Sequence, residues 1–222
     1  MSNKKNISEV KYISIEGVIG SGKTSLAKKI KDRLNAKILF EQFDTNPFLE
    51  KFYTDRNRYA FQTQMFFLVN RFKQQEQLRQ EELFTEFIVS DYLFEKDRIF
   101  AYLNLNAEEL KLYESLYPLL ARNLRKPDLV VFLQSSTDRL MYNIKKRNRK
   151  VERAMGRSYI EELSEAYNYF FFRYNSTPLL IVNSTDIDFV NSKDDFEELF
   201  KQLFREDRGV KEYFKPESKK AG

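Results

Sequence analysis

Eight consecutive residues near the N-terminus match the pattern G-x-x-x-x-G-K-[ST] of a phosphate-binding loop. Glycines let such a loop wrap tightly around phosphate oxygens, so that successive backbone N–H groups point at the anion. Lys23 would reach the β- and γ-phosphates, and the Thr24 hydroxyl would coordinate Mg²⁺. We expect phosphate contacts along the whole loop: Gly17, Val18, Ile19, Gly20, Ser21, Gly22, Lys23 and Thr24. The sequence therefore predicts a site for a nucleoside triphosphate.

The elements around the loop argue against a chance glycine-rich turn. The run 11–16 is typical of a strand that enters the loop, and 25–34 is typical of an amphipathic helix that leaves it. Strands and helices then alternate to the end of the chain. We expect strands at 36–41, 86–90, 128–133 and 179–182, and helices at 47–53, 59–83, 107–124, 137–147, 158–174 and 194–204. This order predicts an α/β, three-layer P-loop kinase fold, with a five-stranded parallel sheet flanked by helices.

Acid–base chemistry in this chain must rest on carboxylates, lysine or tyrosine, because it has no histidine and no cysteine. In an open parallel sheet, ligands bind beyond the carboxyl ends of the strands. Glu41 ends the second strand and is our candidate base for a substrate hydroxyl, although an ordinary loop carboxylate explains it equally well. Asp91 follows the third strand, where it could assist Thr24 in holding a metal ion.

The helix expected at 59–83 carries Gln64 and Arg71 on one face, because seven residues make two turns. Such a pair among aromatic side chains could read the edge of a nucleobase, but an interhelical hydrogen bond is an alternative. Asp97, two turns along a helix from Asp91, could face the same cleft. Three neighbouring charged residues fit an exposed helix surface: Glu95, Lys96 and Arg98.

The densest positive cluster of the chain spans 145–157 and follows the helix expected after the fourth strand. Kinases need arginines that close over the transferring phosphoryl group. Beside a phosphate-binding loop, the cluster therefore predicts an arginine-rich lid at about 147–157, with Arg147 and Arg149 as catalytic residues. A solvated basic surface and a nucleic-acid-binding patch are the alternatives.

Length and charge bound the remaining possibilities. The 222 residues suit one domain, placed at 11–208, with a flexible segment at 1–10 and a disordered tail at 209–222. The net charge of +5 suits a triphosphate site and gives only weak support to nucleic-acid binding. No run approaches 18 apolar residues, and 1–10 lacks the apolar core of a signal peptide. We therefore expect a cytoplasmic protein with no membrane partner.

Together, these residues resemble the deoxynucleoside kinase family, which includes the deoxycytidine, deoxyguanosine and deoxyadenosine kinases. The resemblance covers about 11–204 and depends on the joint spacing of the motifs. It implies that Glu41 activates the sugar 5′-hydroxyl, and that Tyr53 and Glu152 bind the 3′-hydroxyl. Tyr53 stands at the family's spacing, eleven residues before Gln64. The resemblance also assigns base recognition and the lid arginines: Gln64, Arg71 and Asp97 to the base, and Arg147 and Arg149 to the lid.

One departure from the family pattern concerns the end of the third strand. The family usually has an acid followed by an arginine there, whereas this chain has Asp91 followed by Tyr92. The arginine that normally touches phosphate and the 5′-hydroxyl region is therefore missing. Lys96, one turn further on, is our hypothesis for its replacement.

The expected activity is transfer of the γ-phosphate of ATP, with Mg²⁺, to the 5′-hydroxyl of a 2′-deoxynucleoside in nucleotide salvage. The pair Arg71 and Asp97 resembles kinases of deoxyadenosine, deoxyguanosine and deoxycytidine; we favour a purine, deoxyadenosine first, and rank thymidine last. Two alternatives are a nucleoside monophosphate kinase of the thymidylate kinase type and, more distantly, a P-loop module that binds nucleic acid. The Asn-Lys-x-Asp motif of a regulatory GTPase is absent.

The two long helices, 59–83 and 107–124, carry many aromatic side chains. Two such helices from each subunit could form a four-helix interface, as in the family, and this predicts a homodimer. Alternatively, the helices only cover the sheet.

Overall fold

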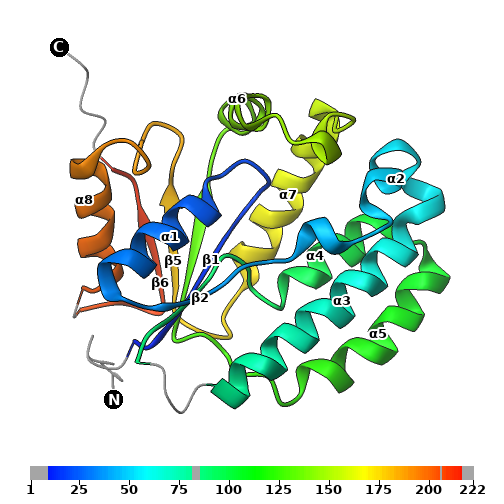
Figure 1. Cartoon of the computed structure of the whole chain (residues 1–222), viewed down its shortest axis with the longest axis horizontal. Helices are drawn as coiled ribbons and strands as arrows, with labels where there is room; N and C mark the ends of the chain where they lie inside the picture. The colour runs from blue at the N-terminus through cyan, green and yellow to red at the C-terminus, as the bar shows by residue number, and fades with distance from the viewer. Residues whose placement is uncertain (1–9, 82–85, 206, 217–222) are drawn as a thin grey trace.

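The central strand of the sheet, β1 (Tyr12–Gly17), is buried along its whole length. The computed structural model describes residues 10–81, 86–205 and 207–216 and shows the predicted three-layer α/β architecture (Figure 1). Six parallel strands follow the order β2-β3-β1-β4-β5-β6. The other strands are β2 (Lys37–Leu39), β3 (Ile88–Ser90), β4 (Leu129–Gln134), β5 (Leu179–Asn183) and β6 (Lys211–Phe214).

The sheet thus has one strand more than the five that the sequence predicts. β6 pairs in parallel with the edge of β5, from Leu179 opposite Lys211 to Val182 opposite Phe214. The prediction of a disordered tail from 209 is therefore wrong for β6, whereas 217–222, like 1–9 of the expected flexible N-terminus, lie outside the described residues. Exposed and half-buried residues alternate along this short edge strand, so it lacks the apolar run that marks a buried parallel strand.

Two helices cover one face of the sheet, α1 (Lys23–Leu34) and α8 (Lys193–Leu203) (Figure 1). Their buried residues, such as Leu26 and Leu199, pack in one core with the apolar side chains of the strands. On the other face lies α7 (Arg157–Arg173), whose Phe171 ring stacks on a phenylalanine of β4 with the centroids 4.3 Å apart. These apolar side chains form the two interfaces between the layers.

Beyond α7, three further helices build a wall beside the sheet: α3 (Arg56–Glu81), α4 (Lys96–Asn104) and α5 (Ala107–Ala121) (Figure 1). The short helix α2 (Leu49–Thr54) packs on α3, and α6 (Thr137–Arg147) follows β4. The predicted helices agree with the observed ones to within about a turn over the described residues, but α4 has no counterpart among the helix ranges expected from the sequence. This wall and the sheet enclose the carboxyl ends of β1, β2 and β3.

The connection between β3 and the wall differs from the prediction. Asp91 and Asp97 do not share one helix, because α4 begins only at Lys96 after a turn in which Lys96 N–H donates to Leu93 O at 3.1 Å. An exposed charged surface is also wrong for Lys96, which is 3% exposed. Its ammonium is buried because carboxylates from other elements neutralise it, and this pairing cannot be read from the local charge pattern.

Candidate active site

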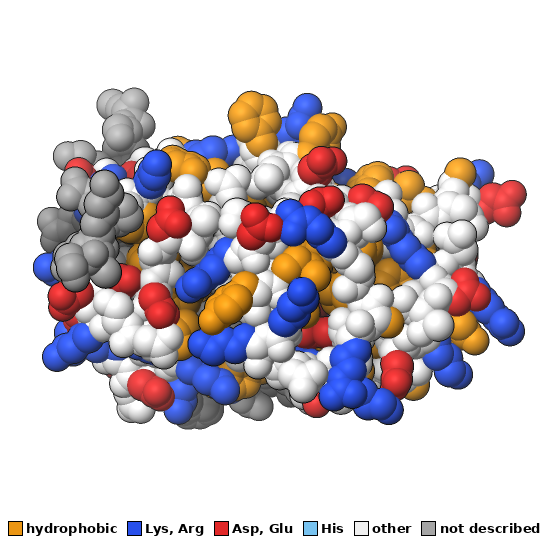
Figure 2. All heavy atoms as spheres, turned by 90° about the horizontal axis from the view of Figure 1, so that it is seen from above, with side chains coloured by type: hydrophobic (Ala, Val, Ile, Leu, Met, Phe, Trp, Pro, Cys, Tyr) orange, Lys and Arg blue, Asp and Glu red, His pale blue; other side chains and the backbone are white. Residues whose placement is uncertain are grey.

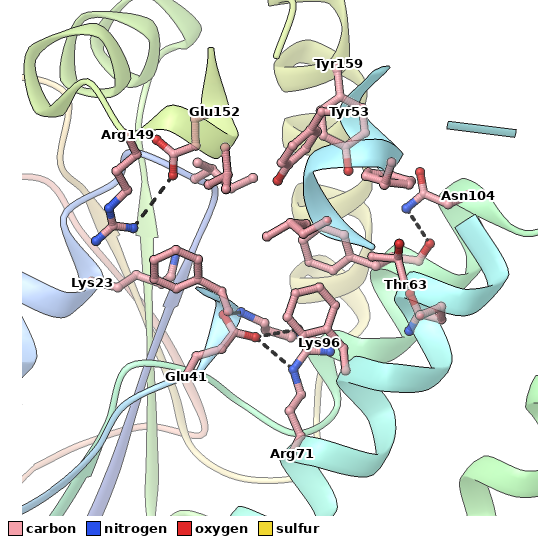
Figure 3. Close-up of a pocket in the computed structure, with 18 of the residues that line it drawn as sticks. Lys23, Glu41, Tyr53, Thr63, Arg71, Lys96, Asn104, Arg149, Glu152 and Tyr159 are labelled. Carbon is pink, nitrogen blue, oxygen red and sulfur yellow. Dashed lines mark hydrogen bonds and ion pairs between the residues drawn. The ribbon is translucent and has the colours of Figure 1, made fainter. Parts of the chain in front are cut away.

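A cavity of about 110 Å³ lies between the carboxyl ends of the strands, the wall of helices and the segment after α6 (Figure 3). Its lining brings together ten of the residues that the sequence nominates: Lys23, Thr24, Glu41, Tyr53, Gln64, Arg71, Asp91, Arg147, Arg149 and Glu152. Ile19 of the loop also lines it. Asp97 is fully buried behind this wall and contacts the lining through Gln64 and Arg71.

The phosphate-binding loop joins β1 to α1, as the motif predicts. Gly20 and Gly22 have φ of 92° and 95°, a left-handed conformation that only glycine adopts without strain. The Asn143 side chain of α6 donates to Gly20 O at 2.8 Å and holds the loop from outside. Lys23 Nζ donates to Gly17 O at 2.6 Å, so its ammonium lies inside the curve of the loop. Burial, and then the charge of Lys96, lowers the pKa of Lys23 to about 8.

Thr24 and Asp91 place a hydroxyl and a carboxylate side by side at the loop. The Thr24 hydroxyl donates to Asp91 Oδ2 at 2.6 Å, and the Glu41 N–H donates to Asp91 Oδ1 at 2.7 Å. No group of three or more carboxylate, histidine or cysteine ligands occurs among the described residues. Mg²⁺ in kinases is typically bound by one or two protein oxygens together with phosphates and water. The pair therefore fits a magnesium ion that arrives with the triphosphate.

The carboxylate of Glu41 lies between the side chains of Arg71 and Lys96 at the edge of the cavity (Figure 3). Its Oε1 accepts from Arg71 Nε at 2.9 Å and from Arg71 Nη2 at 2.5 Å, and its Oε2 accepts from Lys96 Nζ at 2.7 Å. Burial opposes ionisation, but the charges of Lys96 and Arg71 outweigh it and lower the pKa of Glu41 to about 2. Glu41 is therefore a carboxylate, with its two oxygens fixed in direction, throughout the physiological pH range.

Gln64 and Arg71 both lie on the cavity side of α3, as their spacing predicts. Gln64 Nε2 donates to Asp97 O at 2.9 Å and to Asp97 Oδ1 at 2.5 Å. Arg71 Nη1 donates to Asp97 Oδ2, so that one guanidinium bridges Asp97 and Glu41. Burial raises the pKa of Asp97, whereas Arg71 and Gln64 counteract it by stabilising the carboxylate. The interhelical hydrogen bonds are therefore present, and the same two side chains also line the cavity. Their role in reading a base stays a prediction.

The lid residues come together around one buried carboxylate. Glu152 lies in the short helix η4 (Lys150–Glu152), is 7% exposed and accepts from Arg147 Nε at 2.8 Å. Arg149 Nη1 lies 3.7 Å from Glu152 Oε1, and its guanidinium covers the ring of Phe43 at 4.4 Å (Figure 3). Glu152 thus neutralises both arginines and holds them at the mouth of the cavity.

Tyr53 projects from α2 into the upper part of the cavity, near Glu152 (Figure 3). Its ring makes edge contacts with Phe52 and Tyr159, at centroid distances of 5.4 Å and 6.1 Å. Burial raises the pKa of Tyr53 well above its ordinary value, so its hydroxyl stays protonated and can donate a hydrogen bond.

Tyr92, which stands where an arginine was expected, does not line the cavity. It is fully buried, and its hydroxyl lies 3.5 Å from Gln75 Nε2 in a polar cluster with Tyr12 and Ser90. Lys96 instead enters the cavity one turn further on, where it contacts Glu41 and lies 3.7 Å from Glu16 Oε1. This placement supports the hypothesis that Lys96 takes the position of the missing cation.

Sequence reasoning left several lining residues unnamed. They come from α2, α3, α4 and α7 and are mostly apolar or uncharged: Leu49, Phe52, Ala60, Thr63, Phe67, Phe100, Asn104, Tyr159 and Tyr167. An apolar or neutral residue on a helix has no spacing signal that separates a ligand-facing position from an ordinary core position. Ala60, Thr63 and Phe67 share the helical face of Gln64 and Arg71. Their position on this face is the sequence feature that could have indicated that they line the cavity.

Comparison with known proteins agrees with the fold and identifies the family. The family model described as Deoxynucleoside kinase matches residues 13–206. The chain is 34% identical to deoxyguanosine kinase of Bacillus subtilis (strain 168) over 193 residues, which cover 85% of the chain and 93% of that protein. It is 30% identical to the deoxyadenosine/deoxycytidine kinase of the same organism over 198 residues, which cover 86% of the chain and 90% of that protein.

A solved structure of deoxyadenosine kinase from M. mycoides with bound dATP matches with a TM-score of 0.76 and 28% identity, covering 87% of this chain and 98% of that one. The chain therefore belongs to the deoxynucleoside kinase family. It is accordingly an ATP-dependent kinase of deoxynucleosides, which sets aside the nucleoside monophosphate kinases and the nucleic-acid-binding modules.

Proposed function

We propose that the chain transfers the γ-phosphate of MgATP to the 5′-hydroxyl of a 2′-deoxynucleoside whose base carries an exocyclic amino group, deoxyadenosine first and deoxycytidine second. The observation that carries this proposal is that the phosphate-binding Lys23 and the carboxylate of Glu41 line one cavity. The γ-phosphate of a donor bound at the loop and a hydroxyl bound at Glu41 would then lie in the same cavity, in position for direct transfer.

On the donor side, the loop amides and Lys23 would hold the phosphates, with Lys23 Nζ turning from the loop carbonyls toward them. Thr24 and Asp91 would hold Mg²⁺, which neutralises charge on the β- and γ-phosphates. A second groove borders the outer side of the loop and suits the nucleoside of the donor. Its lining includes Gly20, Gly22, Arg139, Asn143, Asp188 and Phe189.

On the acceptor side, Glu41 would accept the hydrogen bond of the 5′-hydroxyl and take its proton as the new P–O bond forms. A pKa of about 2 makes Glu41 a weak base. This suits phosphoryl transfer, whose loose transition state needs an oriented nucleophile more than a strong base. Arg147 and Arg149 would balance the charge on the equatorial oxygens of the moving phosphoryl group.

Tyr53 and Glu152 would bind the 3′-hydroxyl of the sugar, with the tyrosine donating and the carboxylate accepting. Because Glu152 also bonds Arg147, a sugar bound at Glu152 would set the position of a lid arginine. Occupancy of the acceptor site would therefore help to assemble the site of transfer.

Base preference follows from the hydrogen-bonding atoms that Gln64 leaves free. Its Nε2 already donates to two oxygens of Asp97, so its Oε1 remains to accept a hydrogen bond. An exocyclic amino group, as on adenine or cytosine, donates to such an acceptor. The O4 of thymine is itself an acceptor and would repel Gln64 Oε1. Relatives are named for deoxyguanosine as well as for deoxyadenosine and deoxycytidine, so this choice rests on Gln64.

A coupled phosphorylation assay with MgATP tests the proposal, using the four natural deoxynucleosides and their monophosphates. We expect deoxyadenosine to be the best substrate, and we expect Glu41→Gln to lose this activity. Turnover of monophosphates alone would contradict the acceptor assignment, and a preference for thymidine would contradict the assignment of Gln64.

We also propose that the chain forms a homodimer. The predicted helices α3 and α5 pack on each other through Leu68 and Tyr113, and Leu119 of α5 remains 73% exposed. A second apolar surface lies on α4 and α7, where Tyr102 is 51% and Phe172 is 75% exposed. Light scattering on Leu119→Arg and Phe172→Arg distinguishes the two faces, because only a charge within the interface should produce monomers. Monomeric wild-type protein would contradict the dimer.

Nucleic-acid binding at the basic segment receives little support. On the face seen in Figure 2, Lys and Arg side chains are interspersed with Asp and Glu. Arg157 bonds Asp138 at 2.6 Å and Glu161 at 2.8 Å, and Lys150 lies 3.4 Å from Glu50. No helix in the described ranges has the length and apolar content of a membrane span. The cytoplasm remains our predicted compartment.

A further inference from the structure

Thr63 places a buried hydroxyl without a hydrogen-bond partner on the cavity wall. The residue is 5% exposed and lines the cavity, and Thr63 Oγ1 has no partner within the described part of the chain (Figure 3). A buried hydroxyl that has lost water and gained no partner is unfavourable. The proposed function does not use this group.

The surroundings of Thr63 do not explain the unpaired hydroxyl. A threonine within a helix often donates to the carbonyl four residues earlier, and this one does not. Its own carbonyl accepts from Asn46 Nδ2 at 3.1 Å, which anchors the backbone but leaves the hydroxyl free. Ala60, one turn before it on α3, also lines the cavity and offers no polar atom.

The order of residues along α3 indicates which part of a nucleoside reaches Thr63. Glu41, where the 5′-hydroxyl would bind, contacts α3 through Arg71, and Gln64, two turns nearer the start of the helix, is the residue proposed to accept from the base. Thr63 precedes Arg71 by eight residues, or about 12 Å along the helix axis. Thr63 therefore lies beside Gln64 in the cavity lining, remote from the contact of α3 with Glu41.

We propose that Thr63 selects purines, its hydroxyl donating a hydrogen bond to N7, the ring nitrogen beside the amino group of adenine, where cytosine has a C–H. This inference rests on the proposed function. A hydroxyl can donate to a ring nitrogen, and the adjacent Gln64 offers an acceptor for the exocyclic amino group. The two neighbours thus match N7 and the exocyclic amino group of an adenine. The smaller cytosine would engage Gln64 and leave Thr63 unpaired.

Two matched variants isolate the hydroxyl. Thr63→Val keeps the shape and replaces the hydroxyl with a methyl group, whereas Thr63→Ser keeps the hydroxyl. We expect Thr63→Val to lower kcat/KM for deoxyadenosine about tenfold, mainly through KM, and to leave deoxycytidine within a factor of two. Thr63→Ser should retain the ratio between the two substrates. Without ligand, Thr63→Val should melt no lower than wild type, because the hydroxyl has no partner to lose.

Substrate analogues identify the partner atom. In 3-deaza- and 7-deaza-deoxyadenosine, a C–H replaces one ring nitrogen. We expect 7-deaza-deoxyadenosine to cost the wild-type enzyme the same factor as Thr63→Val, and to cost the Thr63→Val enzyme nothing more, whereas the 3-deaza analogue should affect both enzymes alike. Equal sensitivity of both enzymes to both analogues would overturn the inference, as would unchanged kinetics of Thr63→Val. Calorimetric titration of the same nucleosides measures binding independently of turnover. A wild-type enzyme that phosphorylates no deoxynucleoside would instead refute the proposed function.

Discussion

Lys96 Nζ lies 2.7 Å from Glu41 Oε2 and 3.7 Å from Glu16 Oε1. Glu16 immediately precedes the phosphate-binding loop, is fully buried and accepts the Gly17 N–H at 3.0 Å. A single buried ammonium therefore joins the carboxylate of the proposed acceptor site to the strand that carries the donor loop. This cation comes from α4, whereas the family places an arginine directly after the acid of the third strand.

The first prediction concerns this ammonium. Lys96→Ala should lower kcat at least tenfold, because Glu41 loses one of the two cations that orient it and the site of transfer loses a positive charge. Steady-state kinetics with saturating deoxynucleoside and MgATP measures the effect. Lys96→Arg is the matched control and should retain most activity. An unchanged rate in Lys96→Ala would remove Lys96 from the mechanism.

Glu41→Gln should lower kcat by about 10²–10⁴, the usual contribution of a positioned acid–base group. The amide keeps the size of the side chain but offers one acceptor and no negative charge to the 5′-hydroxyl. KM for MgATP should change little, because the phosphates bind at the loop. Single-turnover kinetics separates the chemical step from binding. If the rate of this step survived, Glu41 would be a structural carboxylate.

The same residue predicts how stability depends on pH. The pKa of Glu41 falls from 4.5 to about 2 on folding, so the folded state favours the carboxylate. Its contribution, roughly 3 kcal/mol at most, is present above pH 4.5 and is lost as the pH falls toward 2. Urea unfolding of wild type and Glu41→Gln should therefore differ less at pH 2.5 than at pH 6. Glu50→Gln removes a surface ion pair and should be nearly neutral at both values. A constant difference across pH for Glu41→Gln would contradict the shift.

The sequence predicts most of the charged site because topology makes strand ends converge. Glu41 and Asp91 follow neighbouring strands, and parallel strands bring their carboxyl ends to one edge of the sheet. Gln64 and Arg71 follow from helical spacing alone. Asp97 was expected on one helix with Asp91, and this was wrong because α4 begins at Lys96. The turn before α4 nevertheless directs the Asp97 side chain toward Gln64.

The remaining residues have no local signal. Lys96 stands in a charged run that is typical of a helix surface, and only the distant Glu41 and Glu16 account for its burial. The edge strand β6 forms because it pairs with β5, and its own sequence lacks the apolar run of a buried strand. Thr63 is one neutral residue on a long helix, and only the cavity and its missing partner distinguish it.

Arg71 provides a test of base recognition. It bridges Glu41 and Asp97, so Arg71→Met alone would leave two buried carboxylates with fewer partners and would destabilise the fold by about 3–5 kcal/mol. The double variant Arg71→Met/Asp97→Asn removes one of these charges and is the better test. We expect loss of deoxyadenosine turnover and a gain in the ratio of thymidine to deoxyadenosine. Competition assays with both nucleosides measure the ratio, and an unchanged ratio would count against a role in base choice.

The phosphate-binding loop provides a test of the fold and the donor site together. A Cβ at Gly20 would lie 2.7 Å from Leu140 O, a backbone atom that cannot move aside, and φ there is 92°. Gly20→Ala should therefore destabilise the protein by at least about 1–2 kcal/mol and abolish binding of MgATP. Gly156→Ala is the matched control: its φ is −79°, and its Cβ would meet nothing closer than 3.9 Å. Thermal melts with and without MgATP measure both effects. Gly20→Ala should melt lower and gain nothing from MgATP, whereas Gly156→Ala should behave as wild type. A nucleotide-induced shift retained in Gly20→Ala would mean that the loop tolerates a side chain there and that the donor phosphates do not depend on its left-handed backbone.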